Sequence, residues 1–347
     1  MKTGISLTAL AAKIEAQRDL KHDLIAPTAQ TTVETSTDKV SSLIVPGHGS
    51  FPILPLAHRQ IAAHTGIPAQ YYDRMQAEQP ELLARNVNTW FSAKPANRMI
   101  RTLGGDMRAF LSDRYQRIEN EEIAEAALPV LGDLPGVKIV SCEVTERRLY
   151  IHAVVPTVTG EVKRGDVVEA GVIISNSEVG LGSVSVQGLI WRLVCLNGMK
   201  TSDAFRRNHV GRKVEDNEAL WADDTRKADD KAVLLKVRDM VRAAVDETKF
   251  RVQLQKLQGL TEGKIVGSPE KAIEVLARKV GATEGERGGI LRSLIEGGDL
   301  SRWGIVNAIT HQAHSTESYD RAVEFEGMGG QLVDLPATEW KEILEAA

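Results

Sequence analysis

The stretch that most constrains the fold spans residues 165–213, GDVVEAGVIISNSEVGLGSVSVQGLIWRLVCLNGMKTSDAFRRNHVGRK. β-branched residues are dense over 166–175, which favours a pleated, half-buried strand over a helix. Over 182–195, apolar and polar residues first alternate, as in a strand with one buried face, and an apolar run follows. Residues that tolerate positive φ separate the two runs and predict a hairpin with a long loop: Asn176, Gly180 and Gly182.

A basic segment follows the second predicted strand, after an Asn197-Gly198 turn. Only Asp203 opposes its cations. Such a cluster creates a local field that attracts phosphate, although a solvated helix or loop face has the same composition. The candidate nucleic-acid-binding residues here are Lys200, Arg206, Arg207, His209, Arg212 and Lys213.

A second basic region spans residues 98–120, RMIRTLGGDMRAFLSDRYQRIEN, and turns around Gly104-Gly105-Asp106 in a predicted hairpin. Arginines for phosphates and aromatic rings for bases suit single-stranded nucleic acid, where stacking contributes about 1–3 kcal/mol per base. Alternatively, Phe110 belongs to the core and the arginines pair with nearby acids. The candidates from this region, with one from the strand above, are Arg101, Arg108, Arg114, Tyr115, Arg117 and Arg192.

Several separated motifs occur in order along the chain: RAFLSDRYQRIEN, SNSEVGLGS, WRLVCLNGM, HVG and WGIVNAITHQAH. With these motifs the chain resembles a family of bacterial, phage and plasmid proteins described as phage/plasmid-like and carrying a domain of unknown function. The resemblance extends over about residues 55–335. It implies a mobile-element setting, where replication, recombination and anti-host functions are common, and it implies no catalytic residues.

The order of patterns predicts an α+β fold: an antiparallel sheet of about four to six strands flanked by helices, followed by a C-terminal helical bundle. We expect an N-terminal helix and extended arm (1–50), an α+β core with basic hairpins (51–213) and a mostly helical acidic region (214–347). The net charge of −4 supports this division, because 1–213 carry +3 and 214–347 carry −7.

The sequence also predicts where the helices begin and end. An amphipathic helix over 121–128 is expected to end at Pro129, since proline lacks the backbone N–H that a helix interior uses. A long or broken helix is expected over 215–258. The bundle is then completed by helices at about 269–280, 285–296, 301–313 and 316–327.

Composition and cysteine usage indicate the compartment in which the protein resides. No signal peptide pattern and no run long enough to span a bilayer occur, and an apolar content of 42% is typical of a globular protein. Cys142 and Cys195 fall in predicted apolar strands and fit a reducing cytoplasm. We therefore expect a cytoplasmic protein without a cofactor, in a bacterial or phage-infected cell.

Other chemistry has weaker support. The segment 56–75 resembles a helix-turn-helix, whose second helix would offer Gln70, Tyr71, Tyr72 and Arg74. Cys195 with His209 lacks a third catalytic residue, and 180–182 lacks the lysine of a phosphate-binding loop. The histidines His311 and His314, with Glu317, miss the zincin spacing. Carboxylates that could gather around Mg²⁺ are Asp113, Glu119, Glu121, Glu122 and Glu178. No catalytic residue and no metal ligand is assigned.

Together these patterns predict a nucleic-acid-binding protein of a phage, prophage or plasmid that binds and anneals single-stranded DNA in recombination and assembles as a homo-oligomer. Annealing needs no catalytic group, so an enzyme is not the favoured class. The alternatives are a Mg²⁺-dependent nuclease, a module that binds a host protein, and a sequence-specific regulator.

Overall fold

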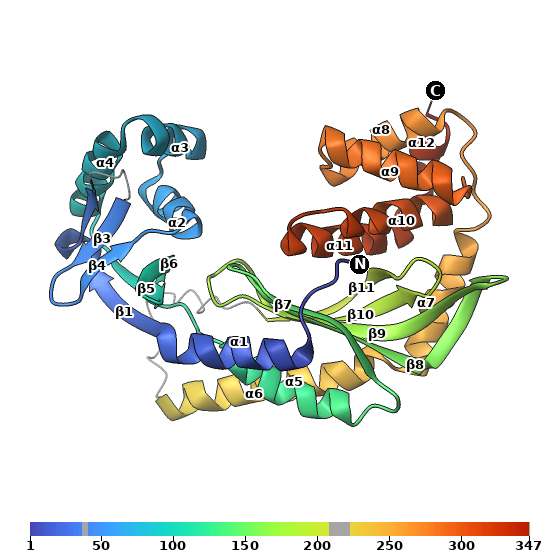
Figure 1. The fold of residues 1–347 in the computed structure, drawn as a ribbon, viewed down its shortest axis with the longest axis horizontal. Coiled ribbons are helices and arrows are strands. Elements are labelled where there is room, and N and C mark those ends of the chain that lie inside the picture. Colours follow the sequence, from blue (N-terminus) through green and yellow to red (C-terminus); the bar gives the residue numbers. More distant parts are fainter. Residues whose placement is uncertain (37–40, 208–222, 347) are drawn as a thin grey trace.

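The computed structural model describes residues 1–36, 41–207 and 223–346, with only the backbone described for 202–207 and 223–227. Figure 1 shows a central sheet, three helices beneath it, the C-terminal helices above it, and an N-terminal lobe to one side. No helix within the described ranges is both long enough and apolar enough to cross a membrane.

The central sheet is an antiparallel meander in which each strand pairs with the next in sequence, in the order β11-β10-β9-β8-β7. This confirms the predicted α+β class and the predicted hairpin, which is observed over residues 166–192. The basic segment after Asn197 is a strand rather than a helix or loop as far as Arg207, because it pairs along β10. The strands are β7 (Lys138–Val144), β8 (Leu149–Lys163), β9 (Asp166–Asn176), β10 (Val184–Arg192) and β11 (Asn197–Arg207).

One face of the sheet is covered by α1 (Leu7–Leu20), α5 (Asn120–Gly132) and α6 (Asp223–Ala244) (Figure 1). Each helix presents apolar residues at a spacing of three or four, so one side of it is buried. On α6 these residues are Val233, Val237 and Val241, and they share a core with sheet residues such as Val172 and Ile174.

Helix α5 corrects one sequence-based boundary. Pro129 lies inside the helix, which continues to Gly132, whereas the sequence pattern predicts an end at Pro129. The burial of Val130 and Leu131 against α1, α6 and the sheet explains this, because apolar packing offsets the missing backbone hydrogen bond.

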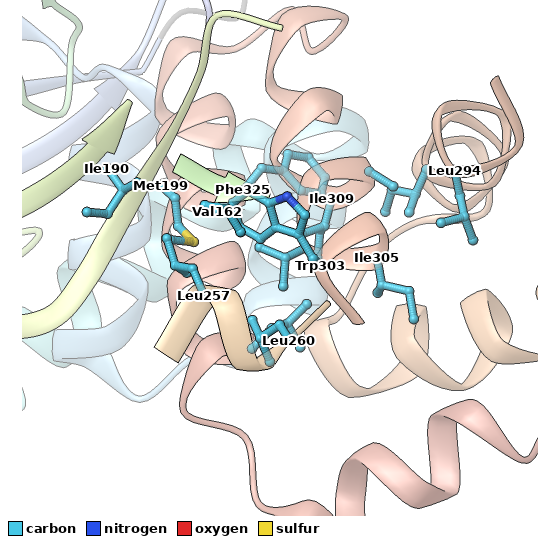
Figure 2. Packing of buried hydrophobic residues seen from close by; sticks show 14 of the residues in the cluster. Val162, Ile190, Met199, Leu257, Leu260, Leu294, Trp303, Ile305, Ile309 and Phe325 are labelled. Carbon is cyan, nitrogen blue, oxygen red and sulfur yellow. The ribbon is translucent and has the colours of Figure 1, made fainter. Parts of the chain in front are cut away.

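The C-terminal helices enclose a second core, shown in Figure 2. The predicted break in the 215–258 helix occurs after Ala244, where Asp246 caps the next helix. These helices are α7 (Glu247–Gly259), α8 (Pro269–Val280), α9 (Glu284–Gly297), α10 (Arg302–His311), the short 3₁₀ helix η2 (Gln312–His314), α11 (Tyr319–Val333) and α12 (Ala337–Leu344). Trp303 of α10 lies at the centre of this core, near Met199 of β11 and Phe325 of α11 (Figure 2).

Helix α11 lies close to β11 at Gly330, where the absence of a side chain allows the two backbones to approach. A Cβ placed on Gly330 would overlap the backbone carbonyl of Lys200. We predict that Gly330→Ala lowers the free energy of unfolding by about 1–3 kcal/mol, because the helix must move away from the strand. Gly288→Ala is the matched control: this position in α9 is exposed with no atom within 4 Å of the added Cβ, so a gain of about 0.5–1 kcal/mol is expected. Urea unfolding of both variants measures the contrast, and equal effects would contradict it.

The N-terminal lobe (residues 21–112) contains two small sheets and three helices. The hairpin predicted around Gly104-Gly105-Asp106 is confirmed as β5 and β6. The first sheet is β1 (Lys21–Pro27), β5 (Asn97–Leu103) and β6 (Asp106–Ser112), in the order β1-β5-β6. The second is β2 (Thr32–Thr35), β3 (Ser41–Val45) and β4 (Gly49–Pro52), and a 3₁₀ turn η1 (Thr28–Gln30) precedes it. The helices are α2 (Pro55–Thr65), α3 (Ala69–Glu78) and α4 (Pro80–Ala93).

Helices α2 and α3 form the helical pair expected over 56–75, joined at Gly66 with φ +73°. Tyr72 is buried and bonds through its hydroxyl to Nδ1 of His58, at 2.9 Å, so it is not available to read DNA. Gln70, Tyr71 and Arg74 are exposed, and Arg74 pairs with Glu78.

Candidate functional site

The loop 177–183, between β9 and β10, joins the N-terminal lobe to the central sheet. Gln60 of α2 donates to the carbonyl of Val179, and the Tyr115 hydroxyl donates to the carbonyl of Ser177. These contacts bring the motif SNSEVGLGS against the motif RAFLSDRYQRIEN, although more than fifty residues separate them in the sequence. The two motifs therefore form one structural unit, which we call the joint (residues 113–120 and 177–183 with their lobe contacts).

Glu178 is the centre of the joint, and its side chain is 2% exposed. Its carboxylate accepts from Lys21 Nζ at 2.5 Å, from Arg108 Nη1 at 2.8 Å and from the backbone N–H of Asn120 at 2.7 Å. Burial alone would raise the pKa of Glu178, but Arg108 and Lys21 outweigh it and lower the pKa to about 2. This carboxylate is therefore ionised across the ordinary pH range and links β1, β6 and α5.

Arg101 is the third buried cation of the joint, with a side chain 1% exposed. It donates to Asp23 at 2.9 Å, to the carbonyl of Glu178 at 2.7 Å and to Glu119. Burial, followed by the neighbouring Glu178 charge, raises the pKa of Glu119 despite Arg101. The joint thus places three carboxylates against a matching set of cations.

The arginines predicted from the 98–120 region therefore occupy different environments. Arg101 and Arg108 are sealed inside the joint, and Phe110 belongs to the core of the N-terminal lobe, so the alternative of paired arginines describes them, although Asp23 and Glu178 are not among the nearby acids that it expected. Arg117 is exposed but pairs with Asp23 at 3.0 Å. Tyr115 is half-buried, whereas Arg114 is exposed.

Arg192 lies at the other end of the sheet, in a second junction of sequence motifs. Its guanidinium binds Asp166 through two hydrogen bonds of 2.6 and 2.9 Å and lies over the ring of Trp303, whose Nε1–H donates to the same carboxylate at 2.8 Å. Lys200 packs beside Gly327 of α11. The structure therefore places Arg192 in a packing role, which the expectation of a phosphate ligand did not foresee.

The remaining basic candidates lie on or beyond the end of β11. Arg206 and Arg207 are in the strand, opposite Ser185 and Val184 of β10. His209, Arg212 and Lys213 fall outside the described residues, and so does any pairing of His209 with Cys195.

Arg206 and Arg207 share an end of the sheet with Arg147, in the turn between β7 and β8. The register places Ser175 between Ser185 and Tyr150, so the ends of five strands form one row. Arg147 is exposed, and its carbonyl accepts from Ser177, the first residue of the 177–183 loop. We call Arg114, Arg147, Arg206 and Arg207 the basic sheet end.

The carboxylates considered for Mg²⁺ have partners within the protein, and Glu119 and Glu178 share Lys21. Glu122 completes a capping box with Glu119, and Glu121 binds Arg18 on α1. Asp113 accepts from Ser112, one residue earlier. Across the described residues, no group of three or more histidine, cysteine and acidic side chains is arranged to hold a metal ion.

The remaining histidine and cysteine candidates lie near the turn between β10 and β11. His314 Nε2 is 2.9 Å from Asn197 Oδ1, whereas His311 bonds to Ser293, so the two rings are neighbours with different partners. Cys195 is half-buried in the turn rather than in a strand, with Sγ 3.0 Å from Arg192. Burial raises the pKa of the Cys142 thiol to about 11, which keeps it protonated.

The motifs thus lie in an antiparallel meander that has helices on both faces. A charged joint connects this meander to a smaller lobe. The comparison with protein families matches residues 109–324 to the domain of unknown function DUF932, and the chain belongs to this family. The matched segment begins within β6 and ends within α11, so it includes residues 113–120 and 177–183 of the joint and the whole central sheet, whereas Lys21, Arg101 and Arg108 lie before it. No curated protein and no solved structure matches the chain.

Proposed function

We propose that the chain binds single-stranded nucleic acid at the basic sheet end. The observation that carries this proposal is the register of the sheet, which gathers cations from distant parts of the sequence: Arg147 from the first strand pair and Arg206 and Arg207 from the last. Arg114 lies in the same region through its neighbour Tyr115, which bonds to Ser177.

The charge of this end favours a polyanion. Exposed Asp113 and Glu146 lie beside Arg114 and Arg147 in sequence, so the excess of positive charge comes from Arg206 and Arg207. Five strand ends extend over roughly 19 Å at the usual strand spacing. A row of this length offers several phosphates of one strand a binding position, and phosphate binding by cations releases counterions.

The finer part of the proposal follows from the resemblance to phage/plasmid-like proteins. The chain would act in a mobile-element setting, in the cytoplasm of a bacterial or phage-infected cell, by annealing complementary strands as a homo-oligomer. When the protein binds a strand through its phosphates, the bases face away from the protein and stay free to pair with a complementary strand. No catalytic group and no cofactor are required for such a step.

The test is a fluorescence-anisotropy titration with labelled single-stranded and double-stranded oligonucleotides at several salt concentrations. The double variant Arg206→Ala/Arg207→Ala should weaken binding to the single strand. It should also reduce the slope of log K against log salt by about one for each phosphate that the protein no longer neutralises. Arg147→Ala should reduce the slope by about one as well.

The matched control is Arg164→Ala. Arg164 is exposed in the turn between β8 and β9, at the opposite end of the same sheet, so its replacement removes the same charge from the other side. Equal reductions in affinity for Arg164→Ala and Arg147→Ala would reject the site. Product formation that depends on Mg²⁺ would favour the nuclease instead, and no binding at low salt would favour the host-protein module.

A further inference from the structure

The guanidinium of Arg108 is incompletely satisfied. Its side chain is nine-tenths buried, yet among the described residues only Nη1 has a hydrogen-bond partner, while Nε and Nη2 are buried without one. These two nitrogens form the edge of a guanidinium that binds an oxyanion through two parallel hydrogen bonds. Buried donors without acceptors are costly, so this edge marks an unused binding capacity.

The groups around the Glu178 carboxylate are those of an oxyanion site. Two of them are cationic, Lys21 and Arg108, and the third is the N–H of Asn120 at the first residue of α5. The N-terminus of a helix together with cations is a favourable environment for phosphate. The Glu178 carboxylate thus accepts hydrogen bonds from a set of donors that would also suit a phosphate.

We propose that the joint is a closed oxyanion site, in which Glu178 holds Lys21 and Arg108 until a phosphate replaces it. Displacement of the 177–183 loop exposes these cations and the free edge of Arg108, and a phosphate group then binds across them. Glu119 and Asp23 remain on Lys21, Arg101 and Arg117, so the lobe keeps part of its attachment during the exchange.

This inference builds on the proposed function, because a phosphate of the bound strand would be the natural occupant. The loop also bonds to Arg147 of the basic sheet end, through Ser177. A strand bound there lies close to the loop that must move. Phosphate binding at the joint would therefore follow the first binding at the basic sheet end.

The test uses inorganic phosphate against chloride at equal ionic strength, with thermal unfolding as the readout. Glu178→Gln removes the competing charge, so its affinity for phosphate should rise about tenfold over the wild type, as expected for one charge-assisted hydrogen-bonded interaction. The double variant Glu178→Gln/Arg108→Lys should not show this increase, because lysine keeps the charge and lacks the two-nitrogen edge.

The matched control is Glu286→Gln, which changes the net charge by the same amount at the distant Arg321 pair of the C-terminal helices. Equal phosphate affinities of the Glu178 and Glu286 variants would overturn the proposal, and so would an increase that survives Arg108→Lys. Phosphate binding without nucleic-acid binding would keep the oxyanion site and reject the proposed function.

If the variants do not fold, hydrogen exchange of the wild-type protein tests whether phosphate displaces the 177–183 loop. Inorganic phosphate should accelerate exchange at residues 177–183 relative to chloride, while exchange in α8 stays the same. Unchanged or slower exchange of the loop at saturating phosphate would overturn the proposal.

Discussion

Glu178→Ala is expected to lower the free energy of unfolding by about 3–5 kcal/mol, because it leaves Arg108 buried without a counter-charge and Lys21 with Glu119 alone. Lys21 and Arg108 are each about nine-tenths buried and share this carboxylate. The backbone N–H of Asn120 would lose its acceptor as well. The destabilisation thus combines two broken ion pairs with an unsatisfied donor.

Urea unfolding at neutral pH measures this effect. The control is Glu78→Ala, which breaks an ion pair with Arg74 on the surface of α3, where both side chains are more than half exposed. Exposed pairs contribute only about 0–1 kcal/mol. A Glu178 variant that is no less stable than the Glu78 variant would show that the joint does not hold the two parts together.

The same position should change the acid dependence of stability. The folded-state pKa of Glu178 is about 2, below the ordinary value of 4.5, so its stabilising contribution is present above pH 4.5 and is lost as the pH falls towards 2. The difference in unfolding free energy between wild type and Glu178→Gln should therefore shrink over this interval. Glu119 offsets part of this change, because the Glu178 charge contributes to its raised pKa in the wild type and is missing in the variant.

Trp303→Ala should also cost about 3–5 kcal/mol, through the cavity left in the C-terminal core. Trp303 is 2% exposed and packs among residues from the sheet and several helices (Figure 2). Its Nε1–H donates to Asp166, which also binds Arg192. Trp303→Phe keeps most of the ring and should cost less than the alanine variant, with the missing hydrogen bond contributing about 1 kcal/mol.

Thermal and urea unfolding of both Trp303 variants provide the measurement. Trp90→Ala is the control, because Trp90 is 39% exposed at the end of α4 and contacts Lys94 through its ring face. A destabilisation of about 1 kcal/mol or less is expected there. Equal destabilisation by Trp90→Ala and Trp303→Ala would contradict the inference that Trp303 is central to the C-terminal core.

Local patterns in the sequence predicted much of the fold. The strands over 166–176 and 184–192 follow from β-branched density and two-residue alternation, and the turn at 104–106 follows from its glycines. The helix predicted at about 285–296 is observed as α9, and a capping box between Thr283 and Glu286 fixes its start. Such features depend on neighbours in sequence, so they can be inferred without knowledge of the tertiary structure.

The sequence alone determined the α+β class, the order of elements from the hairpin at residue 98 to the strand that ends at Arg192, and the division of charge between the halves of the chain. The tertiary structure decided which arginines are enclosed, because Asp23 and Glu178 reach Arg101 and Arg108 from distant segments. It also decided that the basic segment continues the sheet and that α5 passes through Pro129. In each case the deciding partner lies far away in sequence, and the energies of burial and pairing depend on that partner rather than on the local pattern.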